Sequence, residues 1–440
     1  MIILMRSLSL LLLFITACGS VSDTAAAGAD GGGNGTNAAC TPNTTVCASG
    51  QLTVCGAAGT VQSTETCAIA CGASGDACQE LSPANGLAAE LDGASAGPDA
   101  VFSAGAIVFN SDTGDVTSNG GPFTVPSMLH SQGSGLPQIR VFQFKSLAIR
   151  THTTITGTNA IALVSRGAVE IAALVEIAGR STTPAPGAIT ATSSCQGGDS
   201  SVADPTGSTT RVPGAAGAGF GTAGGTGGSA IRSGASLAPG GTRGSIAGVV
   251  NIEPLRGGCR GGNVLSPQDA FWVTSGGGGG GALQISSRTR ITVTSSGIID
   301  AGGGGAYGGK SGAGGGSGGA LLLEAPQVSV DGTLVANGGA GGCFNVDGEN
   351  GQVAYRAGSL EAKGGSCNAA GGVGSGGNGG TKDMAPADGV NASTTTAAPI
   401  GGGGGGAAGR VHINSLTGTF AKGAMSLVSP LASEAMIHVR

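Results

Sequence analysis

Few residues in this chain could do chemistry, and most of the motifs they form follow from the abundance of glycine. Residues 304–311 match the phosphate-binding P-loop, and residues 315–319 match the Gly-x-Ser-x-Gly turn that carries a nucleophilic serine. Both motifs need a helix directly after the loop, and the glycine-rich residues that follow here disfavour one. We therefore expect no nucleotide site and no catalytic serine.

Carboxylates offer a second possible chemistry, because enzymes that cleave polysaccharides use paired acids or an acid-rich calcium site. Asp347 and Glu349 could bind calcium weakly, but a solvated loop explains them more simply. The four histidines show no spacing typical of metal ligands. We expect no catalytic residue, no metal site and no cofactor. An enzyme would need a cleft in which acidic side chains converge, for example those of Glu170, Glu176, Asp300 and Glu324.

The single tryptophan, Trp272, stands beside Phe271, just before a run of six glycines. An aromatic pair on an exposed face could stack on a sugar ring. The alternative is that the pair is buried and anchors the segment before it.

Cysteines indicate an exported, disulfide-bonded protein. Six of the eleven fall within 39 residues, which predicts a small module held by bridges, and six cysteines allow fifteen pairings. A zinc site is disfavoured there because no Cys-x-x-Cys occurs. Four more fall in two long glycine-rich excursions, where we expect one bridge within each excursion or, alternatively, bridges between them. The ten candidates are Cys40, Cys47, Cys55, Cys67, Cys71, Cys78, Cys195, Cys259, Cys343 and Cys367.

The N-terminus has the features of an export signal. Arg6 precedes an apolar run, residues 8–15, that is too short to span a bilayer. Residues 15–18 resemble the bacterial lipobox, which implies removal of residues 1–17 and a lipid on Cys18. An ordinary signal peptide with a chance cysteine is the alternative. Gly19 replaces the aspartate that retains many lipoproteins in the inner membrane, so the resemblance favours the outer membrane, in either leaflet. Residues 18–39 form a flexible tether.

The elements that must position these residues are short strands in near-copies. Apolar residues alternate at period two and end in Gly, Asn or Asp at 160–179, 282–302 and 320–338, with a fragment at 410–413. Units that cannot close a core alone are expected to stack. Residues 139–179 resemble the rungs of right-handed β-helix proteins of the filamentous-haemagglutinin type. We expect an all-β fold: a parallel β-helix or β-solenoid over 80–440, after a disulfide module at 40–79, with excursions at about 180–275 and 338–405. The alternative is a glycine-rich β-sandwich.

Glycine contributes 90 of 440 residues, without the strict Gly-x-y period of collagen. With 40% hydrophobic residues and a net charge of only −5, the chain lacks the composition of a disordered protein and the basic surface that nucleic acids require. The glycine runs are either mobile or packed so closely that only glycine fits. Close packing resembles polyglycine-II helices lying side by side, and their position beside strand pairs favours it.

Together, the tether, the cysteine module, the string Leu-Arg-Gly-Gly-Cys at 255–259 and the repeated glycine strings resemble an uncharacterised family of glycine-rich surface lipoproteins of myxobacteria. The resemblance implies a structural or adhesive lipoprotein without catalysis, anchored in the cell envelope. Its partners would be the membrane, through the lipid on Cys18, and polysaccharide or other envelope components, with no nucleic acid and no nucleotide. A β-helix enzyme that cleaves polysaccharides (a lyase or hydrolase) and a polysaccharide-binding module are the alternatives.

Overall fold

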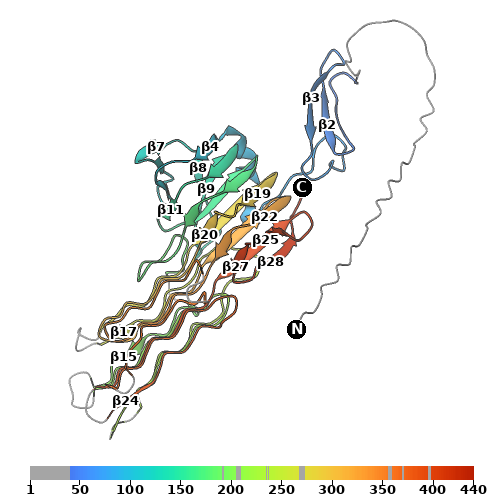
Figure 1. The fold of residues 1–440 in the computed structure, drawn as a ribbon. Helices are drawn as coiled ribbons and strands as arrows, with labels where there is room; N and C mark the ends of the chain where they lie inside the picture. Colours follow the sequence, from blue (N-terminus) through green and yellow to red (C-terminus); the bar gives the residue numbers. More distant parts are fainter. Residues whose placement is uncertain are drawn as a thin grey trace, which may run out of the picture.

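The computed structural model describes residues 40–440 except 191–192, 205–209, 234, 236, 267–272, 355–358, 369–370 and 395–397. In this part of the chain the fold is nearly all β, as predicted, with one short α-helix and two 3-10 turns. Figure 1 shows a small N-terminal sheet, a group of large sheets, and long extended segments that run away from the large sheets.

The N-terminal module is an antiparallel sheet of β1 (Thr45–Ala48), β2 (Gln51–Cys55) and β3 (Val61–Thr66). Three disulfides hold it: Cys40–Cys55, Cys47–Cys71 and Cys67–Cys78. All six side chains of β3 are exposed, and within β1 and β2 only Cys47 and Cys55 are buried. The module therefore depends on its bridges where a larger domain would use an apolar core.

Three large sheets form the body of the molecule, and their strands are short. The first sheet contains β4 (Asp99–Phe102), β10 (Ser146–Ile149), β13 (Val169–Ile171), β19 (Arg290–Val293), β22 (Gln327–Val330) and β26 (Ala421–Lys422). The second contains β5 (Ile107–Asn110), β11 (Thr153–Thr156), β14 (Leu174–Glu176), β20 (Ile298–Asp300), β23 (Thr333–Val335) and β27 (Leu427–Ser429), with the antiparallel β6 (Val116–Ser118) and β7 (Gly121–Phe123) at one edge. The third contains β9 (Ile139–Phe144), β12 (Ala160–Ser165), β18 (Ala282–Ser287), β21 (Ala320–Glu324), β25 (Arg410–Ser415) and β28 (Ser433–Met436), with the antiparallel β8 (Ser127–His130) at its edge.

From β9 onward the chain visits the third, first and second sheets in turn, and each new strand pairs in parallel with the strand one circuit earlier. The near-copies seen in the sequence are therefore neighbours in space. Ile161, Leu283, Leu321 and Val411 occupy one register position on four adjacent strands. All four belong to one apolar cluster that also takes in buried residues of the other two sheets. Period-two alternation thus sends one face of most strands of these sheets into a common core.

The opposite face of the third sheet is also buried, because the segment after the N-terminal module covers it. This segment contains η1 (Ala84–Gly86), α1 (Ala88–Gly93) and η2 (Ala94–Ala96). Its Leu81, Leu87 and Leu91 pack with Val141 and Leu322 in a second apolar cluster. Burial on both faces explains why β9, β12 and β18 have no exposed residue.

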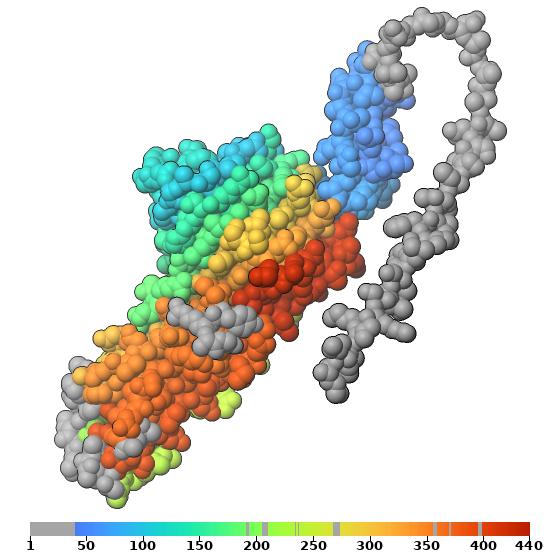
Figure 2. Space-filling model, viewed as in Figure 1, coloured from blue at the N-terminus to red at the C-terminus, as the bar shows by residue number. Residues whose placement is uncertain are grey.

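Three glycine-rich excursions leave the second sheet and return to the third, at 177–281, 301–319 and 336–409. We call these segments together the glycine array. The first and third correspond to the excursions predicted at 180–275 and 338–405; the middle one was not recognised from the sequence. The described residues of these excursions form only very short strands: β15 (Ser200–Ser201), β16 (Ala230–Arg232), β17 (Val264–Leu265) and β24 (Ala392–Thr394). Figure 2 shows that the array continues the body as one elongated mass.

Candidate functional site

Backbone hydrogen bonds organise the glycine array with a threefold period. In the run 401–406, successive N–H groups point to three different neighbouring segments, and every third residue returns to the same neighbour. The N–H groups of Gly401 and Gly404 donate to the carbonyls of Val212 and Ala215, respectively. Those of Gly402 and Gly405 donate to Val390 and Ala387, and those of Gly403 and Gly406 donate to Gly342 and Gly339. All six N–O distances are 2.8–3.0 Å. Three residues per turn is the geometry of the polyproline-II type of helix.

The middle excursion lies inside this lattice. Residues 314–319 donate in the same threefold rotation to residues 259–262 of the first excursion, 404–407 of the third, and 301–304 of the middle excursion itself. Backbone groups that would be costly to bury unpaired are therefore satisfied by segments far apart in the sequence. The three excursions form one hydrogen-bonded unit.

Glycine is required in the array because a Cβ atom has no room there. A Cβ built at Gly402, Gly403 or Gly405 would lie far closer than 3.0 Å to the carbonyl oxygen of Ser375, Ala313 or Asn378, respectively. None of these three glycines has φ in the left-handed region, so conformational freedom does not explain their presence. Of the two alternatives left open by the sequence, close packing is the one observed.

Two disulfides cross-link the array. Cys195 is bonded to Cys259 and Cys343 to Cys367, so the prediction of one bridge within each long excursion is confirmed. Cys195 and Cys259 are fully buried with Ala218. Each bridge closes a loop of the array that has few apolar side chains of its own.

The serines of the two look-alike motifs have structural roles. Ser311 is buried and donates a hydrogen bond to Thr274 Oγ1 at 2.6 Å. Ser317 is buried and accepts a hydrogen bond from the N–H of Cys259 at 2.8 Å. The residues after each serine are extended segments of the array and not a helix.

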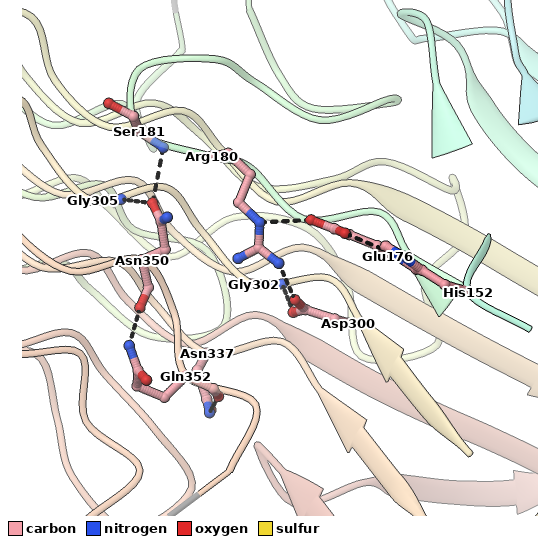
Figure 3. A network of polar contacts seen from close by, with 10 residues as sticks. All are labelled: His152, Glu176, Arg180, Ser181, Asp300, Gly302, Gly305, Asn337, Asn350 and Gln352. Carbon is pink, nitrogen blue, oxygen red and sulfur yellow. Dashed lines mark hydrogen bonds and ion pairs between the residues drawn. The ribbon is translucent and has the colours of Figure 1, made fainter. Parts of the chain in front are cut away.

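An ion-pair network marks the place where the excursions leave the second sheet (Figure 3). Glu176 and Asp300 are partners in register on β14 and β20. Arg180 lies between them, with Nε 2.7 Å from Glu176 and Nη2 2.8 Å from Asp300. His152 Nε2 lies 3.2 Å from the other oxygen of Glu176. Arg180 therefore joins the exits of the first and middle excursions.

Burial affects the two carboxylates differently. Asp300 is fully buried, and this burial raises its pKa although the guanidinium of Arg180 opposes the rise. Burial also acts on Glu176, but there the hydrogen bond and charge of Arg180 outweigh it and hold the pKa below its usual value. Burial works against the charge of Arg180 as well, yet its two carboxylate partners raise its pKa.

Asn350 connects all three excursions at the same place. Its Oδ1 accepts hydrogen bonds from the N–H of Ser181 in the first excursion and of Gly305 in the middle one, both at 2.8 Å. Its own carbonyl accepts one from Gln352 Nε2 at 2.7 Å, and the Gln352 carbonyl accepts one from Asn337 Nδ2 at 2.7 Å. Sequence reasoning missed Asn350, because a single asparagine in a glycine-rich loop carries no periodic signal.

The four acids considered for an enzyme lie in three separate places. Glu176 and Asp300 are together, with Arg180 between them. Glu170 is on the first sheet and pairs with Arg150 at 2.8 Å. Glu324 is buried on the covered face of the third sheet, where it accepts hydrogen bonds from the N–H of Ala84 and from the side chains of Gln284 and Asn414. Burial raises the pKa of Glu324, and the hydrogen bonds from Asn414 and Ala84 oppose the rise.

Several predicted site residues lie outside the described residues: Cys18, Phe271, Trp272, the signal segment 1–17 and the tether. Asp347 is described, and its Oδ1 accepts a hydrogen bond from the N–H of Gly308 at 2.6 Å. The sulfur atoms of Cys47, Cys67 and Cys71 lie close enough to hold a metal, but all three belong to the disulfides described above.

Comparisons with protein-family models, with curated proteins and with solved structures find no match to this chain. The resemblance to myxobacterial surface lipoproteins stays a prediction. Among the described residues, no helix has the length and hydrophobicity needed to cross a membrane.

Proposed function

We propose that this protein is a structural or adhesive component of a bacterial cell envelope that acts without catalysis. The observation that carries the proposal is the glycine array, a unit whose interior consists of hydrogen-bonded backbone and which two disulfides cross-link. Such a unit holds an extended shape with little side-chain chemistry inside it. This combination suits a rigid element that presents a surface better than it suits a catalytic domain.

We also propose that the body is a three-sided, right-handed parallel β-helix. The cyclic visit to three sheets and the parallel pairing of successive circuits support this architecture. Connections between parallel strands are right-handed in nearly all known cases. The described strand pairs of the body are parallel except those made by β6, β7 and β8, which argues against an antiparallel sandwich.

The envelope location rests on the export signal and on Cys18. A lipid on this cysteine, followed by the predicted tether of about twenty residues and the disulfide module, would hold the body at a membrane surface, which we propose is the outer membrane. Five disulfides in the described part agree with an oxidising compartment outside the cytoplasm.

Mass spectrometry of the mature N-terminus tests the anchor. In a bacterial host with lipoprotein processing, we expect the wild-type chain to begin at Cys18 with attached acyl chains and to partition into detergent. The Cys18→Ser variant should remain in the aqueous phase. A mature wild-type chain in which Cys18 is present without a lipid would contradict the proposed anchoring.

A polysaccharide assay tests the absence of catalysis. Residues 40–440 with oxidised disulfides would be incubated with bacterial and plant polysaccharides, and both bound protein and new chain ends would be measured. We expect no new ends. New ends that disappear when the protein is denatured, and that are lost in Glu176→Gln or Asp300→Asn, would establish the lyase or hydrolase alternative instead.

A further inference from the structure

A pocket of about 520 Å³ lies where the body meets the glycine array. Its walls come from the loop before β9, the turn between β11 and β12, and two parts of the first excursion, one around Ile189 and one at Arg256. The lining includes Leu136, Pro137, Thr158, Asn159, Ile189 and Arg256. This volume falls within the usual range for small-molecule sites and suits one or two sugar rings.

Arg256 is the cation of this pocket. Its Nε is buried and has no hydrogen-bond partner. Arg256 also belongs to none of the ion pairs found among the described residues. A buried guanidinium N–H without an acceptor is costly. Arg256 as a whole is only partly buried and lines the pocket, so an anion bound there could pair with the accessible part of its guanidinium group.

A second arginine strengthens the positive potential near Arg256. The pKa of Arg410 is lowered mainly by burial and to a smaller extent by the charge of Arg256. Arg410 donates its hydrogen bonds to the carbonyl of Ala247, which carries no full charge. A ligand anion placed at Arg256 would relieve the repulsion between the two guanidinium groups.

The backbone that carries Arg256 is fixed on both sides. The N–H of Leu255 donates to Gln132 Oε1 at 2.6 Å and to Asn85 Oδ1 at 3.0 Å. The N–H of Gly257 donates to the carbonyl of Gly187 at 2.8 Å. Arg256 is therefore presented from a rigid segment, which lowers the entropic cost of binding.

Thr158 and Asn159 give the pocket a polar wall, and their side chains are also fixed. Asp112 Oδ1 accepts hydrogen bonds from Thr158 Oγ1 at 2.7 Å and from Asn159 Nδ2 at 3.1 Å. The hydrogen bonds from Thr158 and Asn159 outweigh burial and hold the pKa of Asp112 below its ordinary value. The side chains of Thr158 and Asn159 are thus oriented by groups behind them, with polar atoms suited to hydroxyl groups of a ligand.

We propose that this pocket binds a carboxylate-bearing sugar, a uronic acid residue of an acidic polysaccharide. Arg256 would pair with the carboxylate through its planar fork of N–H groups, the geometry in which arginine recognises carboxylates. Thr158 and Asn159 would contact hydroxyls, and Leu136, Pro137 and Ile189 would contact the apolar edge of the ring. The proposal deepens the adhesive role proposed above and rests on it for the source of the ligand, the glycans in and around the envelope.

Isothermal titration calorimetry with the mature full-length protein in detergent tests the site. The probes are short galacturonic acid oligomers and the same oligomers with methyl-esterified carboxylates, which keep the sugar rings and linkages but lack the negative charge. We expect the acid form to bind at least about tenfold more tightly than the ester. Free galacturonate as a third probe distinguishes a polysaccharide site, where the oligomer binds more tightly, from a site for any small carboxylate, where the two bind equally.

Two arginine variants locate the binding. Arg256→Gln should reduce affinity for the acid oligomer to that for the ester, and Arg256→Lys should restore only part of it because the fork is lost. Arg290→Gln removes an exposed arginine of the first sheet and should leave affinity unchanged. Thermal unfolding of each variant checks that the fold is retained.

Equal affinities for acid and ester, equal affinities for the oligomer and free galacturonate, wild-type affinity in a folded Arg256→Gln variant, or no binding of any probe would each overturn the proposal. None of these results would affect the lipid on Cys18 or the absence of cleavage, so failure here is distinct from failure of the envelope role.

Discussion

In the three large sheets the interior is filled by side chains, whereas in the glycine array it is filled by backbone. Leu163, Ile285 and Leu323 stack in the body core with about 1% exposure each. The corresponding layer of the array contains carbonyl oxygens at the positions where Cβ atoms would otherwise lie. The two regions should therefore respond in opposite ways to a change of side-chain volume. A smaller side chain should destabilise the body, and a larger side chain should destabilise the array.

The largest effect is expected from adding one methyl group to the array. Gly403→Ala places a Cβ against the carbonyl of Ala313, so neighbouring segments must separate and lose hydrogen bonds. We expect a loss of about 4 kcal/mol or more in the free energy of unfolding, from overpacking and at least one broken hydrogen bond. Gly371→Ala is the matched control, because its nearest heavy atom would be 3.9 Å away. Equal urea midpoints for the two variants would contradict the packing described here.

Removal of a disulfide should affect the array according to the length of the loop it closes. Cys195 and Cys259 are 64 residues apart, and Cys343 and Cys367 are 24 apart. Replacing the first pair with alanine should cost about 4 kcal/mol and replacing the second about 3 kcal/mol in the chain-entropy description. Chemical denaturation of both double variants shows which of the two losses in stability is larger. A larger loss for the shorter loop would show that local packing outweighs loop closure.

A loss of volume in the body should cost somewhat less. Leu323→Ala empties a position with 1% exposure between Ile285 and Ile413. We expect a loss of about 3 kcal/mol, the middle of the range for buried leucines. The urea midpoint should fall, while the backbone amides of the array should keep their protection against hydrogen exchange. If Leu323→Ala instead has no effect on stability, the side-chain core described for the body is wrong.

At the junction of the two regions, Arg180→Gln leaves the buried carboxylate of Asp300 without its cation. The loss should be roughly 2–3 kcal/mol at neutral pH, below that for a fully buried pair because Arg180 is partly exposed. The pKa of Asp300 is raised in the folded state. Its contribution to stability is therefore present below the unfolded pKa, near 3.9, and is lost as pH rises through the folded pKa. Without Arg180 the pKa of Asp300 rises further. The difference in the free energy of unfolding between wild type and Arg180→Gln should therefore become smaller as pH falls toward 4.

Melting temperatures of wild type and Arg180→Gln between pH 4 and pH 8 measure this dependence. Glu170→Gln serves as the control, because its pair with Arg150 is exposed and should give no resolvable change. A deficit in Arg180→Gln that stays constant over this pH range would exclude Asp300 as its cause.

The body was predictable because its strands carry side-chain periodicity. The alternation predicted strands within 160–179, 282–302 and 320–338, and the structure has β12, β18 and β21 at the start of these three units. The repeat spacing also anticipated that these copies would be neighbours. What the alternation did not reveal is α1, whose six residues are held mainly by packing of Leu91 against the third sheet.

The array was predictable only in its composition. A glycine run carries no side-chain pattern, so nothing in the sequence shows that Gly403 bonds to Gly342 while Gly404 bonds to Ala215. The cysteine pairing within the module was open for a similar reason, since each of the fifteen pairings satisfies the same composition. Arg180 offered a weak signal, four residues after Glu176, but its contact with Asp300 depends on the parallel register of β14 and β20.

Hydrogen–deuterium exchange of the backbone amides in residues 401–407 tests the central claim most directly, because each of these amides donates to a specific carbonyl group of a neighbouring segment. We predict that these amides exchange as slowly as those of β21 and β25, the neighbouring strands of the body. Exchange within seconds, at the rate of an unstructured glycine peptide, would contradict the account and show that the array is not held together by its backbone.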